Sequence, residues 1–418
     1  MIDLLRKYSA KLAVSGLCEP GEPLFAALDD ELVWNTDSDP RQPLLLGVLE
    51  RLNISALLLA RPAGAHQQAL AELAREAIAD GSLSITPGDC ETRTFLHDLP
   101  VVRELTPQAI ATALSHRKGC VIFAEGQVHI AAYGTVSPEQ AYVTFSSVCF
   151  AGFVAYFAGH LRRLRQNSAT PAQKQAFSRI AALLPPGRAD APGLLPGPFA
   201  TEEQARAAII QAGAKTVEYG LVDSYFGNIS YRLSTLDPTR DTILISQTGS
   251  SLDELAPCID PCRLDGGSCA ALTASSEFSA HKAIYEGEGA PSTGGTQAIL
   301  HGHPPFCVIL SLDCPLLDCP DLGQCHRACP RTRCVEDSAS CLNVPIVPGE
   351  VGTGPFGLCN TLPPAILSTL GPRRAAIVYG HGLFALGQRD FRDAFATLME
   401  VEAFCRQEFF RRVGEFGE

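Results

Sequence analysis

The sequence contains one internal repeat, and this repeat constrains the fold more than any other feature. Three blocks of the first half recur in the same order in the second half: residues 10–17 with 214–221, 56–62 with 298–304, and 116–126 with 372–382. A long helical pattern ends each half, at residues 138–165 and 389–410. Repeats of this kind predict copies of one structural unit. With 418 residues, the chain is long enough for two such domains.

The spacing between the blocks is shorter in the first half, so the first copy is expected to be truncated. We place this copy at residues 1–165 and a complete copy at residues 201–418. Residues 166–200 contain Pro185-Pro-Gly187 and a second Pro/Gly-rich run, neither of which continues a helix or a central strand. They are therefore expected to form a linker, with room for a short helix at 171–184.

Each half alternates apolar runs of strand length with stretches of helical pattern, which indicates an α/β fold. The expected strands are residues 55–60, 119–124, 227–233, 242–246, 297–300 and 374–379, with a hairpin over 126–133. The expected helices are residues 4–16, 67–79, 138–165, 201–219, 276–285 and 389–410. Ser137 and Thr201 are expected to cap two of these helices. Residues 311–361 are rich in Cys, Pro and Gly and are expected to be mostly irregular.

Composition and charge exclude some classes of partner. A net charge of −12 argues against nucleic acid or an anionic membrane as a general partner. The N-terminus lacks the apolar core of a signal peptide, and the most apolar stretch, residues 143–161, is interrupted by polar residues and is expected to be a buried helix. We therefore expect a cytoplasmic protein, whose 16 cysteines are thiols or metal ligands rather than disulfides.

Two histidines end the apolar run Ala298-Ile-Leu-His301-Gly-His303-Pro304. On an extended backbone residues i and i+2 point to the same side, so His301 and His303 can direct both imidazoles at one point. The alternative is a pair of loop histidines that bind no metal. His381 leaves the next predicted strand between two glycines and is a candidate third ligand. Three histidines with an open fourth position are typical of a catalytic zinc site.

The first copy lacks these histidines. Where the second half has the three candidate ligands, the repeat aligns Leu59, Arg61 and Glu125. A leucine, an arginine and a glutamate do not form a zinc site. The first copy is therefore expected to keep the fold without the metal chemistry.

Three further stretches of the second half contain residues suited to ligand binding. In Gly227-Asn-Ile-Ser230 the glycine allows close approach and Asn228 offers an amide donor. Gln247-Thr-Gly-Ser-Ser251 has the composition of an anion-binding nest. Ser275-Ser-Glu277-Phe-Ser-Ala-His281 begins a helix, whose N-terminus favours anions. The structural alternatives are a turn, a polar turn and a surface capping box, respectively.

Taken in order, Gly-Asn-Ile-Ser, Thr-Gly-Ser-Ser, Ser-Ser-Glu-x3-His, His-Gly-His-Pro and Gly-His-Gly resemble the class II aldolase/adducin family over residues 201–410. The resemblance implies a three-layer α/β/α fold with a mixed, mostly antiparallel central sheet. It implies a divalent metal, commonly zinc, on His301, His303 and His381, with Glu277 as a ligand of the resting metal or as a base. It also implies homo-oligomeric rings, usually tetramers, and a cradle for the substrate phosphate formed by Asn228, Thr248, Gly249, Ser250, Ser275 and Ser276.

On this basis the second half is expected to be a carbon–carbon lyase acting on a small phosphorylated ketose. A metal that stabilises an enediolate as a Lewis acid, with Glu277 moving the proton, would account for aldol cleavage and condensation. The family also contains epimerases, dehydratases and adducin-like members without the metal. An epimerase or dehydratase with the same site, and a non-catalytic metal- or redox-binding protein, are therefore alternatives.

Two features depart from the family pattern. The separation between His303 and His381 is longer than is typical, because of an insert at about residues 311–345 that contains Cys314, Cys319, Cys325, Cys329, Cys334 and Cys341. None of these forms a C-x-x-C pair, so a second zinc, an iron–sulfur cluster, ordinary thiols and partial disulfides all stay open. The other departure is the N-terminal copy, which we expect to pack where a neighbouring subunit packs in simpler relatives. A dimer of this chain would then imitate a tetramer.

Overall fold

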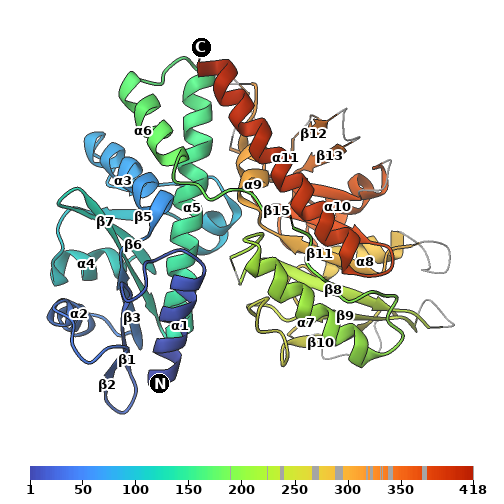
Figure 1. Ribbon diagram of the computed structural model, residues 1–418, viewed down its shortest axis with the longest axis horizontal. Helices are drawn as coiled ribbons and strands as arrows, with labels where there is room; N and C mark the ends of the chain where they lie inside the picture. Colours follow the sequence, from blue (N-terminus) through green and yellow to red (C-terminus); the bar gives the residue numbers. More distant parts are fainter. Residues whose placement is uncertain are drawn as a thin grey trace. The chain divides into compact units, whose positions relative to one another are not determined.

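In the computed structural model the chain forms two units, Met1–Pro186 (unit 1) and Gly187–Glu418 (unit 2). The structure describes all residues except 189, 224, 236–239, 266–272, 288–294, 317–318, 321–322, 330, 332, 338–341, 370–373 and 418. Each unit has a central β-sheet with helices on both faces (Figure 1). The predicted α/β class and the tandem of three-layer domains are confirmed.

Unit 1 is built on a seven-stranded sheet in the order β2-β1-β3-β7-β6-β5-β4. Its strands are β1 (Leu24–Leu28), β2 (Leu32–Trp34), β3 (Ala56–Ala60), β4 (Ser84–Ile85), β5 (Leu99–Val102), β6 (Gly119–Ala124) and β7 (Gln127–Gly134). Its helices are α1 (Ile2–Val14), α2 (Gln42–Leu49), α3 (Gly64–Ala79), the π-helical turn η1 (Thr92–Leu96), α4 (Pro107–Leu114), α5 (Pro138–Arg165) and α6 (Pro171–Ala181). Helices α1 and α3 pack on α5, whereas α2 packs on α4.

Unit 2 is built on an eight-stranded sheet in the order β10-β9-β8-β11-β15-β14-β13-β12. Its strands are β8 (Asn228–Leu233), β9 (Thr242–Ser246), β10 (Ile259–Arg263), β11 (Ala298–Gly302), β12 (Arg333–Asp337), β13 (Leu342–Val347), β14 (Ala375–Val378) and β15 (Gly382–Gly387). Its helices are α7 (Glu202–Glu218), α8 (Phe278–Gly287), α9 (Pro305–Leu312), α10 (Leu358–Leu367) and α11 (Phe391–Gly417). Helices α7 and α9 pack on α11, whereas α8 packs on α10.

The two sheets share one topology. Without β10, the strand order of unit 2 matches that of unit 1 strand for strand. Each sheet has one parallel pair, β5–β6 or β13–β14, in an otherwise antiparallel ladder. The register agrees as well, since Leu24 pairs with Leu59 in unit 1 and Asn228 pairs with His301 in unit 2. The sequence repeat aligns Leu59 with His301, so the N-terminal half copies the topology of the C-terminal half.

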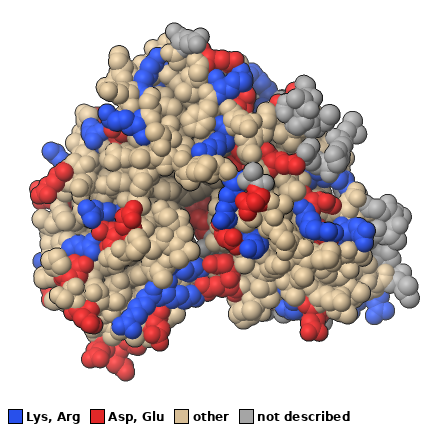
Figure 2. Space-filling view, in the orientation of Figure 1, with Lys and Arg blue, Asp and Glu red and all other residues tan. Residues whose placement is uncertain are grey.

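Charged side chains of both signs are spread over the face of the molecule seen in Figure 2. On this face lysine and arginine alternate with aspartate and glutamate instead of gathering into one patch of a single sign. Interspersed charges of this kind are typical of a solvated protein surface.

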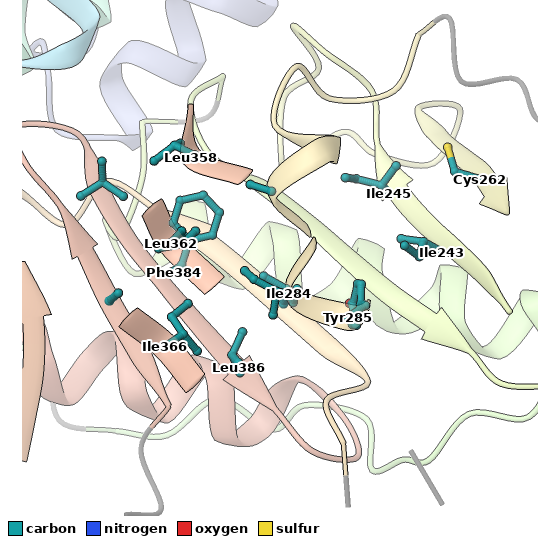
Figure 3. Packing of buried hydrophobic residues seen from close by; sticks show 14 of the residues in the cluster. Ile243, Ile245, Cys262, Ile284, Tyr285, Leu358, Leu362, Ile366, Phe384 and Leu386 are labelled. Atoms are coloured by element: carbon teal, nitrogen blue, oxygen red, sulfur yellow. The ribbon is translucent and has the colours of Figure 1, made fainter. Parts of the chain in front are cut away.

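A buried apolar cluster joins the sheet of unit 2 to α8 and α10. Ile284 of α8, Leu362 and Ile366 of α10 and Phe384 of β15 are all fully buried in it, and Figure 3 shows Leu362 beside the ring of Phe384. Burial of side chains of this size contributes about 1.5–3 kcal/mol each. The ring of Phe384 is therefore fixed within a packed core, which matters for the site below.

Several predicted elements have different ends in the structure. The helix predicted at residues 276–285 begins at Phe278, and the strand predicted at 297–300 extends to Gly302, so His301 lies within a strand. The prediction that residues 311–361 are mostly irregular is wrong for β12, β13 and the start of α10. Pro345 in β13 and Pro363 and Pro364 in α10 explain this error, because prolines in such numbers usually indicate loops.

Residues 166–200, predicted as a linker, are divided between the units. Helix α6 packs on α3 of unit 1 and buries Phe177 and Ile180. From Gly187 onward the chain belongs to unit 2, where the ring of Phe199 lies 5.1 Å from that of Tyr231.

Helix α5 is the described helix that is long and apolar enough to cross a membrane. Of its apolar window, 83% is buried inside the structure. It is thus a core helix of unit 1, in agreement with the buried helix predicted at residues 143–161. Ser137 stands at its N-cap position but makes no side-chain cap bond, whereas Thr201 caps α7 by accepting a hydrogen bond from the Gln204 N–H.

His160 should make the stability of unit 1 depend on pH. Its ring stacks on Phe177 at 3.9 Å, and burial, followed by the charges of Arg163 and Lys174, lowers its pKa to about 4. Between pH 6.5 and 4 the unfolded chain therefore binds more protons at this residue than the folded chain, and stability falls as pH falls. At pH 5 the loss relative to pH 7 should reach at most about 2 kcal/mol.

Replacing His160 with Phe keeps the stack and removes this loss, so the variant should gain on the wild type as the pH drops from 7 to 5. The single tryptophan, Trp34, lies in β2 of unit 1, and its fluorescence during urea unfolding reports this unit. Replacing the exposed His116 with Phe is the matched control. Equal pH dependence in wild type and His160→Phe would contradict the prediction.

Candidate metal centre

Three histidines of unit 2 converge at one point. A ligand nitrogen of each of His301, His303 and His381 lies within 4.8 Å of those of the other two. The ring centroids are 4.9–5.0 Å apart, and the Nε2 atoms of His301 and His303 are 3.2 Å apart. All three side chains are buried. The structure therefore brings together the three residues that the sequence analysis selected as candidate ligands.

The backbone fixes the direction of each ring. His301 lies in β11, its Nδ1 hydrogen-bonds to the Leu383 carbonyl at 3.1 Å, and its ring stacks on Phe384 at 3.9 Å, which leaves Nε2 directed at the other histidines. A partner on the second ring nitrogen is the usual arrangement for metal-binding histidines. His303 follows two residues later, as the alternation along an extended chain requires.

His381 lies in the short loop between β14 and β15. Its backbone N–H donates to the Val378 carbonyl at 3.0 Å. The N–H of the preceding Gly380 donates to the Ser311 hydroxyl of α9 at 2.8 Å. Helix α9 also begins directly after His303 and Pro304. The same helix therefore contacts the backbone next to two candidate ligands, His303 and His381.

The chemistry of the three imidazoles suits a metal. Burial, followed by the charges of neighbouring histidines, holds the pKa of His301 and of His303 well below the usual value. The rings are therefore neutral at physiological pH and can offer a nitrogen lone pair. Three imidazole nitrogens that converge at one point match the three-histidine donor set of a catalytic zinc site.

Gly382 leaves the space that the converging rings occupy. A Cβ at this position would contact the Gly302 carbonyl oxygen and lie 2.7 Å from His303 Cδ2 and 2.9 Å from His301 Cε1. The second glycine of Gly380-His381-Gly382 is thus required by sterics rather than by a turn.

Replacing Gly382 with Ala should therefore lower the free energy of unfolding by about 1–3 kcal/mol, as overpacking in a buried site does, and should reduce the amount of tightly bound metal. Calorimetry and metal analysis of the purified variant measure the two effects. Gly414→Ala in α11 is the matched control, since nothing lies within 4 Å of a Cβ there. A Gly382→Ala variant as stable and as metal-loaded as this control would contradict the steric argument.

A carboxylate lies against the three histidines. Glu277 precedes α8 and is 4% exposed. Its Oε1 is 3.3 Å from His381 Nε2, and its Oε2 is 3.5 Å from His301 Nε2. The same Oε2 accepts a hydrogen bond of 2.6 Å from the side-chain amide of Asn228. Glu277 is thus close enough to share a metal ion with the histidines or to move a proton beside it.

The residues predicted to bind a phosphate lie on one strand end and two adjoining loops. Asn228 contacts Glu277 directly. The other five residues lie on two loops, one with Thr248, Gly249 and Ser250 and one with Ser275 and Ser276. The Thr248 N–H donates a hydrogen bond to the Thr273 carbonyl, and Gln247 forms a β-bridge with Ala274, so the two loops are in contact. The side chain of Asp260, which is also buried, links the two loops because it accepts hydrogen bonds from the side chains of both Gln247 and Thr273.

The residues predicted to bind the phosphate differ in exposure. Thr248, Gly249 and Ser276 are exposed to solvent, whereas Ser275 is buried.

Among the described residues of the insert, the cysteines form no comparable group. In the part of the chain that the structure describes, the three histidines are the group with metal-ligand geometry. Cys314, Cys319, Cys325, Cys329 and Cys334 belong to that part and are thiols rather than disulfides. Cys341, the remaining member of the candidate second metal site, lies outside the described residues.

In unit 1 the corresponding positions have different side chains. Leu59 and Leu24 stand where unit 2 has His301 and Asn228, and both are buried in the core. Arg61, the counterpart of His303, forms an ion pair with Glu22 at 2.9 Å.

Glu125 does not occupy the structural position of His381. The pairing of β6 with β7 continues to Ala124 and Gln127, whereas that of β14 with β15 ends at Val378 and Gly382. Glu125 therefore lies in a tight turn at the tip of a longer hairpin, and the sequence alignment is wrong at the end of this block.

The sequence analysis selected His281 and Ser230 within their motifs but gave neither a role, and it did not select Tyr285. All three are buried and hydrogen-bonded to one another beside Asn228. The spacing of His281 and Tyr285, one helical turn apart, and of Asn228 and Ser230, two residues apart on a strand, is the signal that indicates a shared face.

Comparison with known proteins yields one family and a set of similar structures. Residues 207–409 match the model of the class II aldolase and adducin N-terminal domain. L-fuculose-1-phosphate aldolase from Thermus thermophilus is 21% identical with a TM-score of 0.37, over 51% of this chain and 97% of that chain. Sugar-phosphate aldolase from Thermotoga maritima is 19% identical with a TM-score of 0.35, over 52% and 97%. The N-terminal class II aldolase domain of a conserved protein from Thermoplasma acidophilum is 13% identical with a TM-score of 0.36, over 53% and 99%. No curated protein sequence matches the chain significantly.

Proposed function

Since the C-terminal half of this chain belongs to the class II aldolase and adducin family, we propose that it is a metal-dependent lyase that cleaves and forms a carbon–carbon bond in a small phosphorylated ketose. The observation that supports this proposal best is the position of Glu277, whose two oxygens lie 3.3 and 3.5 Å from the imidazoles of His381 and His301. A carboxylate beside a three-histidine centre combines a proton acceptor with a place for a Lewis acid.

We propose zinc as the resident metal, held by His301, His303 and His381. When bound, the metal supplies a Lewis acid that stabilises negative charge developing on a substrate oxygen. Glu277 takes the proton that is lost when the bond is cleaved and returns it in the reverse direction. The Asn228 amide donates a hydrogen bond to Oε2 of Glu277, so the lone pairs that can accept the substrate proton are those of Oε1 and the remaining one of Oε2.

The phosphate of the substrate is proposed to bind at the two adjoining loops. Thr248, Gly249 and Ser276 are exposed beside the buried Ser275 and Asn228, so hydroxyl and backbone N–H groups are available next to the candidate centre. Such groups are suited to an anion. Asp260 links the two loops through its hydrogen bonds with the side chains of Gln247 and Thr273.

Retro-aldol activity on a panel of ketose 1-phosphates tests the proposal. Cleavage that is lost on treatment with a chelator and restored by Zn²⁺ is the expected result. A change of configuration or loss of water without cleavage would assign the same site to an epimerase or a dehydratase. A zinc-loaded protein that converts no member of the panel would favour the non-catalytic metal- or redox-binding alternative.

The proposed setting is a cytoplasmic homo-oligomer without nucleic-acid or membrane partners. The net charge of −12 supports the exclusion of these anionic partners. Two chains would supply four domains of one topology, the number found in a tetramer of single-domain chains. Light scattering should then give twice the chain mass, and a stable monomer would contradict this assembly.

A further inference from the structure

A chain of buried hydrogen bonds leads from Glu277 into the interior of unit 2. Asn228 Nδ2 donates to Glu277 Oε2 at 2.6 Å, and Asn228 Oδ1 is hydrogen-bonded to His281 Nε2. His281 Nδ1 in turn lies 2.7 Å from the Ser230 hydroxyl, which lies 2.9 Å from the Tyr285 hydroxyl. All five side chains are buried. His281, Ser230 and Tyr285 have no role in the function proposed above.

The scaffold explains why these side chains meet. Asn228 and Ser230 are two residues apart on β8 and share one face of the strand. His281 and Tyr285 are one turn apart on α8 and face the sheet together, as Figure 3 shows for Tyr285. His281 therefore sits between the two β8 residues, and each ring nitrogen contacts one of them.

The chemistry of the acceptors fixes the direction of the protons from Ser230 to Glu277. Asn228 Oδ1 can only accept, so His281 Nε2 carries the proton. His281 is fully buried, burial lowers its pKa to about 3, and its ring is therefore neutral. Its Nδ1 then accepts from the Ser230 hydroxyl. The Tyr285 hydroxyl can donate to the Ser230 hydroxyl or to the carbonyls of Ser230 and Gln297, at 3.2 and 3.3 Å. The result is one directional chain that ends with the Asn228 amide hydrogen on Glu277.

We propose that His281 is a positioning residue for the candidate metal centre, which holds the amide of Asn228 so that its NH₂ group, and not its oxygen, faces Glu277. A flipped amide would direct Oδ1 at the carboxylate and Nδ2 at the His281 N–H, two repulsive contacts. Without His281 the carbonyl side of Asn228 has no fixed donor, and Glu277 loses a fixed orientation. The inference rests on the proposed metal centre and adds a residue that does not touch metal or substrate.

Cobalt binding tests this role without any assay of activity. We expect His281→Leu to weaken Co²⁺ binding by about 10- to 100-fold, as loss of a partner behind a ligand does, and to change the visible absorption bands of the bound ion. His281→Gln should restore most of the affinity, because a glutamine amide can donate to Asn228 and accept from Ser230. Tyr285→Phe, which removes only the far end of the chain, should bind Co²⁺ almost as the wild type does.

A thermodynamic cycle separates positioning from general structural support. If His281 acts through Glu277, then His281→Leu should cause no further loss of affinity in a Glu277→Ala background, because the effects of coupled residues are not additive. The same factor in both backgrounds, or wild-type affinity and spectrum in folded His281→Leu, would overturn the inference. If His281→Leu does not fold, Asn228→Ala breaks the same chain one link nearer and should give the same shift. Failure of the wild type to bind Co²⁺ would instead overturn the proposed metal centre itself.

Discussion

Replacing His301 with Ala is expected to reduce the zinc content of the purified protein from one ion per chain to less than about a tenth of an ion, because three nitrogen ligands are the minimum for a tight catalytic site. The loss should be as large for His303→Ala and His381→Ala, since the three nitrogens converge within 4.8 Å. Turnover should disappear with the metal. Metal analysis after dialysis against a weak chelator measures the effect.

The repeat supplies a matched control for this experiment. Arg61 of unit 1 is the counterpart of His303 in the repeat, and it directly follows β3 as His303 directly follows β11. Arg61→Ala removes an ion pair with Glu22 and should leave one zinc per chain and full turnover. Circular dichroism should show that the histidine variants stay folded, because apolar packing rather than the metal holds the core. Zinc that persists at one ion per chain in all three histidine variants would contradict the assignment and would direct attention to the cysteines.

Local pattern was sufficient to predict much of the fold. Apolar runs such as Ala56–Ala60 and Thr242–Ser246 form strands, and α5 spans the residues that its composition predicts. These elements are determined by short-range periodicity, which the sequence carries directly. The region of β12, β13 and α10 was missed because its structure depends on long-range pairing, such as the parallel pair of β13 with β14. That pairing overrides the local preference of several prolines.

The candidate site was predictable to the same extent. The i, i+2 spacing of His301 and His303 follows from strand geometry, and the repeat drew attention to His381 as a residue that the first copy lacks. The position of Glu125 was not predictable, because hairpin length is set by the register of β6 with β7. The contact between Asn228 and His281 was not predictable either, since it joins a strand and a helix 53 residues apart in the chain.

Replacing Glu277 with Gln is expected to reduce kcat by about 10²- to 10⁴-fold, the usual contribution of a general base. KM should change little, because proton transfer stabilises the transition state rather than the bound ground state. Glutamine keeps the size of the side chain and still accepts from the Asn228 amide, so the packing around the 4% exposed side chain is preserved. The three histidines are untouched, and most of the zinc should remain bound.

The pairing of these two measurements decides what Glu277 does. Loss of turnover with zinc retained identifies a proton-transfer group, whereas loss of both identifies a residue needed mainly to hold the metal. Glu286→Gln, at the exposed C-terminal end of α8, which follows Glu277, controls for removal of one negative charge. Turnover of Glu277→Gln within about threefold of this control would exclude general-base catalysis by Glu277. The 3.3 and 3.5 Å separations from His381 and His301 would then reflect only electrostatic support of the imidazoles.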